Sequence, residues 1–169
     1  MLQLYCVLFL ISNFSDWSFK LFEKNTNTII NIIDKKLIYN SNLDNLDNRN
    51  NVNNVNNVNI HYEKRIKSQK RIVSKLRKFK IPYDIYGLRI IYHDTSNYYN
   101  TKLAYIIKNI IYENFNTLDF IYDDYIEKPK ENNYQSLHIY VVTALLIEIQ
   151  IRNTNMHNIS INGSASLYY

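Results

Sequence analysis

Residues 124–138 read DYIEKPKENNYQSLH, and residues 147–152, a short distance further on, read IEIQIR. The first segment places an acid, two lysines, a tyrosine and a histidine around one proline. The second alternates isoleucine with polar residues, which is the pattern of a β-strand with one apolar and one polar face. Glu148, Gln150 and Arg152 share the polar face. They can line a cleft, or they can belong to an ordinary amphipathic strand whose polar face is wet.

The sequence around these two segments predicts alternating helices and strands. Apolar residues recur at helical spacing over residues 15–39 and 98–112, and residues 154–162 could start a final helix. Residues 62–79 predict a basic amphipathic helix, at least from Lys70 onward, which ends at Ile81-Pro82. Residues 86–92, 136–143 and 145–152 predict strands, the last two as an antiparallel pair. This order predicts an α+β fold, a mixed sheet covered by helices.

The chain divides near residue 60. Residues 50–59 read NNVNNVNNVN, a three-residue repeat without an apolar face, and asparagine is a poor helix former. Residues 40–59 are therefore predicted to be a disordered or variable insert. We expect a leader and asparagine-rich segment over residues 1–60 and one ordered domain over residues 61–169. The apolar run of residues 2–11 is either a targeting leader or a buried element. It is too short for a membrane span, so no stable membrane insertion is expected.

Composition narrows the partners and excludes several kinds of site. The net charge of +5 favours anionic partners, namely nucleotides, nucleic acid or acidic lipid. Cys6 is the only cysteine, which excludes a disulfide framework and a cysteine-based zinc site. Gly87 and Gly163 are the only glycines, so the chain lacks glycine-rich phosphate loops of the Walker and Rossmann types. Side-chain cations must hold any bound phosphate.

Three features outside the last strand can carry chemistry. Asp84 could join Glu148 in binding Mg²⁺, which prefers oxygen ligands, or it could be a turn residue. Tyr134 lies in a polar loop, where it is either a stacking platform for a base, worth about 1–3 kcal/mol, or one more surface tyrosine. The basic run from Lys64 to Lys80 could bind phosphates, bind nucleic acid or simply face solvent.

Taken in order, these motifs resemble the synthetase domain of the RelA/SpoT family, the (p)ppGpp synthetases. The resemblance extends from Arg65 to about Tyr168 and is most specific in the two segments quoted first. The matching positions are Arg65, Lys67, Ile72, Lys75, Asp84, Gly87, Arg89, Ile90, the run from Asp124 to His138, Glu148, Gln150, Ile151, Arg152, Met156, His157 and Gly163.

The resemblance implies a nucleotidyltransferase-like fold, a mixed five-stranded sheet flanked by helices. It implies transfer of pyrophosphate from ATP to the 3′-hydroxyl of GDP or GTP, the reaction of the stringent response. Asp84 and Glu148 would bind Mg²⁺, Glu148 would help to deprotonate the attacking hydroxyl, and Tyr134 would stack on guanine. Substrate-binding roles fall on Arg65, Lys67, Lys75, Lys130, Tyr134, Gln135, His138, Gln150 and Arg152.

Several positions depart from the family pattern. Asp123 stands where the family has lysine, Arg71 where it has serine, Asn133 where it has glycine, Ile161 where it has glutamate and Leu167 where it has histidine. A charge pair at 4 Å is worth about 4 kcal/mol at an effective dielectric of 20. If Asp123 faces phosphate, this reversal would lower the rate by orders of magnitude unless Lys128 or Arg71 compensates. The chain ends about where the family's Tyr-Lys pair falls, which suggests a truncated domain.

Two alternative functions stay open at this point. One is a catalytically inactive guanine-nucleotide-binding regulatory domain. The other is a basic nucleic-acid-binding module, for which RNA rather than DNA is the expected partner. The region before His61 is too short and too rich in asparagine for a paired hydrolase domain. Asparagine-rich inserts and the leader-like N-terminus suggest a plastid-like organelle, with the cytoplasm as the alternative. The sequence does not indicate an oligomeric state.

Overall fold

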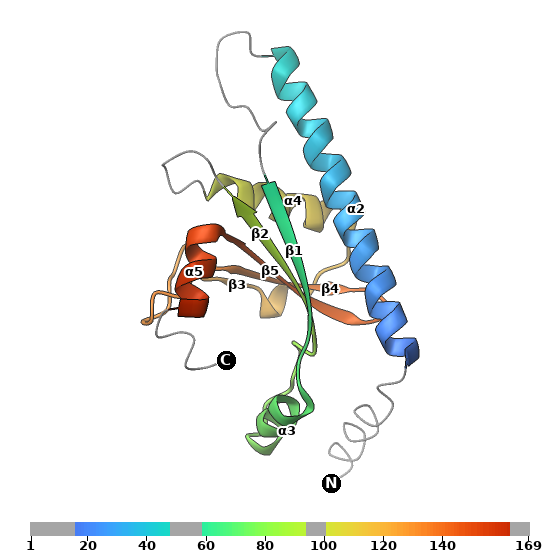
Figure 1. The fold of residues 1–169 in the computed structure, drawn as a ribbon, viewed down its shortest axis with the longest axis vertical. Coiled ribbons are helices and arrows are strands. Elements are labelled where there is room, and N and C mark those ends of the chain that lie inside the picture. The colour runs from blue at the N-terminus through green and yellow to red at the C-terminus, as the bar shows by residue number, and fades with distance from the viewer. Residues whose placement is uncertain (1–15, 48–58, 94–100, 163–169) are drawn as a thin grey trace.

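The computed structural model describes residues 16–47, 59–93 and 101–162 (Figure 1). Along the chain, the helices and strands are α2 (Asp16–Asp47), β1 (Asn59–Ile66), α3 (Gln69–Arg77), β2 (Tyr86–His93), α4 (Lys102–Asn114), the 3₁₀ helix η2 (Asp119–Ile121), β3 (Asp123–Asp124), β4 (Leu137–Val142), β5 (Leu146–Asn153) and α5 (Thr154–Asn162). The helices predicted around residues 98–112 and 154–162 and the strands predicted at 86–92, 136–143 and 145–152 are thus confirmed, with small shifts of their ends.

The strands form one five-stranded sheet in the order β1-β2-β5-β4-β3. β2 and β5 run parallel, whereas β1–β2, β5–β4 and β4–β3 are antiparallel pairs. The sheet is therefore mixed and flanked by helices, as the predicted α+β class requires. Two helices, α3 and α4, interrupt the path from β1 to β4, so residues distant in the sequence meet on neighbouring strands.

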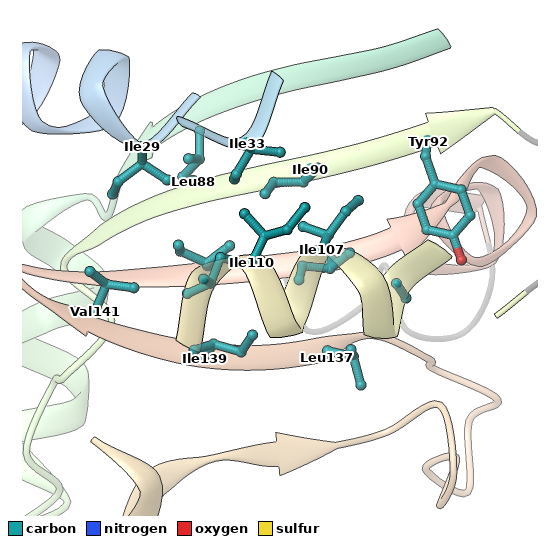
Figure 2. Close-up of a cluster of buried hydrophobic side chains, with 14 of the residues drawn as sticks. Ile29, Ile33, Leu88, Ile90, Tyr92, Ile107, Ile110, Leu137, Ile139 and Val141 are labelled. Carbon is teal, nitrogen blue, oxygen red and sulfur yellow. The ribbon is translucent and has the colours of Figure 1, made fainter. Parts of the chain in front are cut away.

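One face of the sheet carries the hydrophobic core (Figure 2). Side chains alternate between the faces of a strand, and the inward set comprises Leu88, Ile90, Leu137, Ile139, Val141, Ile147, Ile149 and Ile151. Helices α2 and α4 cover this face with Ile29, Ile33, Ile107 and Ile110. The opposite face carries mostly polar residues, and the candidate site lies there.

Helix α2 belongs to this core. Ile29 and Ile33 are fully buried, and the hydroxyl of Tyr62 in β1 donates to the Asp34 carboxylate at 2.6 Å. The helix predicted over residues 15–39 is confirmed, and it continues to Asp47, inside the segment predicted to be disordered. The boundary expected near residue 61 therefore does not separate this helix from the domain. Residues 2–11 and most of the asparagine repeat lie outside the described residues.

The prediction of a helix from residue 62 is wrong for its first part. Tyr62–Ile66 lie in β1, paired antiparallel with β2, and α3 begins only at Gln69. Tyr62 and Lys64 point toward α2, whereas Glu63 and Arg65 point to the polar face, which is the period of a strand. β3 was not predicted, because two residues carry no readable period.

None of the helices in the described ranges is both long enough and apolar enough to cross a lipid bilayer.

The placement of α2 leads to a stability prediction. Ile33→Ala should lower the free energy of unfolding by about 2–4 kcal/mol, because it leaves a cavity in the core. Urea unfolding followed by circular dichroism measures this value. Ile38→Ala, on the same helix at 62% exposure, is the matched control and should change it by less than about 0.5 kcal/mol. Equal effects of the two substitutions would show that α2 is not part of the folded core.

Candidate active site

Strand register brings the polar residues of four strands onto one face of the sheet. Arg65 of β1 pairs with Gly87 of β2, Gly87 lies beside Glu148 of β5, and Glu148 opposes Tyr140 of β4. His138 follows on the same face, opposite Gln150 of β5. Residues separated by more than eighty positions in the sequence therefore form one continuous surface.

This surface is the floor of a cavity of about 590 Å³, and helix α3 forms part of its wall. Its lining includes six cationic side chains and two carboxylates. The charged residues are Arg65, Lys67, Arg71, Lys75, Arg89, Lys130, Asp84 and Glu148, and the uncharged polar ones are Ser74, Asn132, Tyr134, His138 and Gln150. An excess of cations over acids is the composition expected of a cavity for polyphosphates.

Asp84 lies two residues before β2 and is hydrogen-bonded by two lysines. Lys67 donates to its carboxylate, and the Lys75 ammonium lies 2.9 Å from both carboxylate oxygens. Burial tends to raise the pKa of Asp84, but the two lysine hydrogen bonds outweigh burial and lower the pKa below its ordinary value. Burial also lowers the pKa of Lys67. Asp84 is therefore an ionised carboxylate at neutral pH, as a metal ligand must be.

Glu148 lies deep in the same cavity, only 7% exposed. Its Oε1 is 3.0 Å from His138 Nδ1 and accepts a hydrogen bond from the Tyr140 hydroxyl at 3.1 Å. Gln150 Nε2 donates to the other oxygen at 2.9 Å. Burial tends to raise the pKa of Glu148, while the interaction with His138 lowers it more, so the net pKa is below the ordinary value. The charge of Asp84 also reaches Glu148 and acts to raise its pKa.

The two carboxylates thus share one cavity and one electrostatic environment, as the sequence reasoning required. They are two oxygen-bearing ligands, and among the residues described there is no group of three or more His, Cys, Asp or Glu side chains placed to hold a metal ion. A site with only two protein carboxylates suits Mg²⁺, which keeps several waters and binds substrate phosphates as well.

Tyr134 is more enclosed than its polar neighbours suggested. It lines the cavity but is only 5% exposed, so the alternative of one more surface tyrosine is wrong. Its hydroxyl is 2.8 Å from His138 Nε2, and its ring meets Tyr125 edge-on at 5.9 Å between centroids. The Lys130 ammonium lies 4.1 Å from the Tyr125 centroid and 5.5 Å from that of Tyr134. Tyr134 and Lys130 line the cavity, and Tyr125 packs against both.

Two predicted substrate-binding residues do not line the cavity. The Gln135 amide reaches back to the Ile126 carbonyl at 3.5 Å and so holds the loop. Arg152 is fully buried, where it donates to Ser160 Oγ of α5 at 2.7 Å and lies 5.9 Å from the Tyr134 ring centroid. Both side chains are placed to support the cavity wall from behind. Their partners lie nine and eight residues away in the chain, across a loop and across the turn into α5, where no helix or strand period relates the two positions.

Arg89 is a cavity residue that the sequence analysis quoted but did not assign to the site. Its guanidinium bonds Glu63 of β1 at 3.1 Å and Gln150 Oε1 at 3.3 Å, so it links three strands across the floor. The available signal was its position on β2, two residues after Gly87 on the same face. Arg71 also lines the cavity, together with Ser74 from the next turn of α3.

The positions that depart from the family pattern are spread widely. Asp123 lies on edge strand β3 opposite His138, hydrogen bonds with Tyr125 and does not line the cavity. Asn133 has a left-handed backbone, φ 59°, which asparagine tolerates. Ile161 lines a second cavity of about 550 Å³ that shares Arg65, Arg71 and Arg89 with the first. Lys128 is exposed, and Leu167 lies outside the described residues.

Asp124, the first residue of the segment 124–138, has a structural role on the face of the sheet opposite the cavity. Its carboxylate accepts hydrogen bonds from the hydroxyls of Tyr105 and Tyr122 and from the backbone N–H groups of Ile126 and Glu127. This bonding fixes the turn that leads to Lys130 and Tyr134. Adjacent aspartates of β3 therefore serve opposite sides of the sheet.

A mixed sheet that presents two carboxylates and many cations on its open face defines a nucleotidyltransferase-like domain. The chain belongs to the RelA/SpoT family: the family model described as "Region found in RelA / SpoT proteins" matches residues 64–169.

Relatives and solved structures agree with this assignment. The chain is 31% identical, over 160 residues and 90% of its length, to a probable guanosine-3′,5′-bis(diphosphate) 3′-pyrophosphohydrolase of Mycoplasma genitalium, of which it covers 21%. It is 30% identical over 115 residues, 62% of its length, to the chloroplastic GTP diphosphokinase CRSH1 of Oryza sativa subsp. japonica, of which it covers 20%. It therefore spans about a fifth of these curated relatives.

Among solved structures, the chain is similar to small alarmone synthetase 2 of Bacillus subtilis, with a TM-score of 0.52 and 27% identity over 83% of this chain and 75% of that one. It is also similar to small alarmone synthetase 1 of the same organism bound to its product pppGpp, with a TM-score of 0.50 and 29% identity over 63% of this chain and 62% of that one.

The lowered pKa values of the cavity carboxyls predict how stability depends on pH. A carboxyl whose folded-state pKa lies below its unfolded value stabilises the fold above the unfolded pKa, and this contribution is lost as the pH falls through the folded pKa. The ordinary values are 3.8 for Asp84 and 4.5 for Glu148. The free energy of unfolding should therefore decline progressively below about pH 4.5.

Urea unfolding at several pH values between about 3 and 7 measures this decline. Glu148→Gln removes one of the two titrating groups and should make the decline shallower. The exposed Glu113 of α4 provides a control, because Glu113→Gln should leave the slope unchanged. A slope that is the same in Glu148→Gln as in the unmodified chain would contradict the assigned interactions of Glu148.

Proposed function

We propose that this chain is a (p)ppGpp synthetase domain that transfers pyrophosphate from ATP to the 3′-hydroxyl of GDP or GTP. One observation carries the proposal: Asp84 and Glu148 line the same cavity, among six cationic side chains. Membership of the RelA/SpoT family and similarity to the two small alarmone synthetases support it. Transfer of phosphoryl-type groups needs positioning and charge neutralisation more than covalent chemistry, which suits this composition.

The cavity has two sides that suit two different nucleotides. Arg65 comes from β1, Lys67 from the link that follows it, and Arg71 and Lys75 from α3. These four cations would hold the triphosphate of ATP. On the other side, Tyr134 and Lys130 come from the loop before β4 and would hold the guanine nucleotide, with His138 and Gln150 beneath. The Tyr125 ring packs against Tyr134, and the Lys130 ammonium lies near the Tyr134 ring. A base would stack on the part of the Tyr134 ring that faces the cavity, after Lys130 has moved toward phosphate.

Asp84 and Glu148 would hold a Mg²⁺ ion between the two nucleotides, since both are ionised oxygen ligands in one cavity. When bound, this ion would neutralise charge on the phosphates during transfer. Lys67 and Lys75 donate hydrogen bonds to the Asp84 carboxylate. When the metal ion binds Asp84, both ammonium groups would turn toward phosphate instead. Glu148 would also orient the attacking 3′-hydroxyl and accept its proton.

The principal test is the loss of synthesis in Glu148→Gln. With ATP, GDP or GTP and Mg²⁺, the full chain should form ppGpp or pppGpp, separated by anion-exchange chromatography. Glu148→Gln should reduce the rate at least about a hundredfold, because it removes a metal ligand and proton acceptor at once. The surface substitution Glu113→Gln should not. Absence of product from well-folded unmodified protein would reject the activity.

The position of Asp123 predicts a modest cost rather than a lost activity. Asp123 is bonded by Tyr125 and does not line the cavity, so its charge acts on the nucleotides from a distance. Asp123→Lys should therefore lower KM for the guanine nucleotide by less than about fivefold, the range of a partly solvated charge interaction. Steady-state kinetics at low ionic strength measure this change. An increase in kcat of several orders of magnitude would mean that Asp123 contacts phosphate directly.

One observation favours a second candidate, a guanine-nucleotide-binding regulatory domain without turnover. Two lysines already neutralise Asp84, and a metal ion must displace them to bind. Calorimetric binding of GDP that is lost in Tyr134→Ala, without any product from ATP and GDP, would favour this candidate.

For localisation we propose a plastid-like organelle, which the chloroplastic rice relative supports; the cytoplasm is the alternative.

A further inference from the structure

The turn after α3 exposes an aromatic side chain at a backbone position that normally belongs to glycine. Lys80 N–H donates to the Lys75 carbonyl at 3.0 Å, and Phe79 N–H donates to the Leu76 carbonyl at 2.9 Å. These two bonds define a Schellman motif whose left-handed residue is Phe79, with φ 54°. Glycine is the usual residue here, because a bulky side chain at positive φ is strained.

Stability does not explain this phenylalanine. Its side chain is 100% exposed, so the fold gains no burial in return for the strained backbone. Phe120, the next most exposed phenylalanine of the described residues at 76%, lies on the short helix η2 and has no comparable backbone constraint. A side chain that costs folding free energy and is fully exposed among the described residues is suited to a contact outside the chain.

The surroundings of Phe79 indicate the chemistry of that contact. Ile81, two residues on, is 65% exposed. The neighbouring cations Arg77, Lys78 and Lys80 are exposed as well, and so is Lys70 in the first turn of α3. From residue 64 to residue 83 the sequence contains no acidic residue. Two exposed apolar side chains with cationic neighbours in the sequence match a surface that is anionic outside and apolar beneath.

We propose that residues 77–81, the α3 tip, together with Lys70, bind the surface of an anionic lipid bilayer. Phe79 and Ile81 would enter the interfacial region, where aromatic and aliphatic side chains gain by leaving water. Lys70, Arg77, Lys78 and Lys80 would lie at the level of the headgroup phosphates. This is peripheral, reversible attachment, and it does not depend on the activity proposed above.

The shape of the tip favours a bilayer over single-stranded nucleic acid. Figure 1 shows α3 projecting from the lower end of the molecule, away from the sheet, where a flat surface can reach it. Neither of the two cavities includes a residue of the tip, whereas single strands are bound in cationic grooves. Ile81 adds nothing to stacking on bases, but it adds apolar area to an inserted wedge.

Vesicle sedimentation with the full chain tests the proposal. The protein should bind vesicles of phosphatidylcholine with about 30% phosphatidylglycerol, and not vesicles of phosphatidylcholine alone. Binding should weaken in about 0.5 M salt, which screens the cations. Phe79→Gly should lower the partition coefficient about tenfold, since it removes the larger inserted side chain. Lys78→Gln and Lys80→Gln should each lower it about fivefold.

Phe79→Gly is informative because it relieves the backbone, so its melting temperature should equal or exceed that of the unmodified chain. Loss of binding therefore cannot be attributed to unfolding. Phe120→Ser removes an exposed phenylalanine elsewhere and should bind vesicles normally. The proposal is overturned if anionic vesicles are not bound, if Phe79→Gly binds as well as the unmodified chain, or if the tip residues affect binding to a uridine oligonucleotide but not to vesicles.

Discussion

Strand β5 is the constraint on which the rest of the structure depends, because both of its faces are buried. Ile147, Ile149 and Ile151 are fully buried toward the helices, while Glu148 and Gln150 are nearly buried toward the cavity. A slip of one residue against β2 or β4 would place carboxylate and amide groups in the core and isoleucines in the cleft. The register that gives the core its apolar face is therefore the same register that places Glu148 beside His138.

The cavity carries an excess of positive charge. Its cations outnumber its acids, and the pairing of Asp84 with two lysines relieves only part of their repulsion. Such a site is stabilised by anything that brings negative charge to it. Polyphosphate ligands should therefore tighten the domain as well as occupy it, because binding to the folded state alone shifts the unfolding equilibrium.

The sequence was most informative where one period dominated. Ile147 to Arg152 could be assigned to faces correctly because alternation was strict, and the approach of Asp84 to Glu148 followed from the family resemblance. The segment from Tyr62 to Ile66 was assigned to a helix because alternating cations and apolar residues fit both periods over so few positions. The burial of Tyr134 and the rearward role of Gln135 depend on contacts with Tyr125 and Ile126 that no local pattern encodes.

Helix α2 lies outside the residues that the family model matches, but it is part of the folded core. The family match begins at residue 64, within β1, yet Ile29 and Ile33 from α2 cover the apolar face of the sheet. A gene fragment cut at residue 64 would keep α4 but lose α2, so the part of the apolar face that Ile29 and Ile33 cover would be open to water. Such a fragment would aggregate on expression, although it contains every residue that lines the cavity.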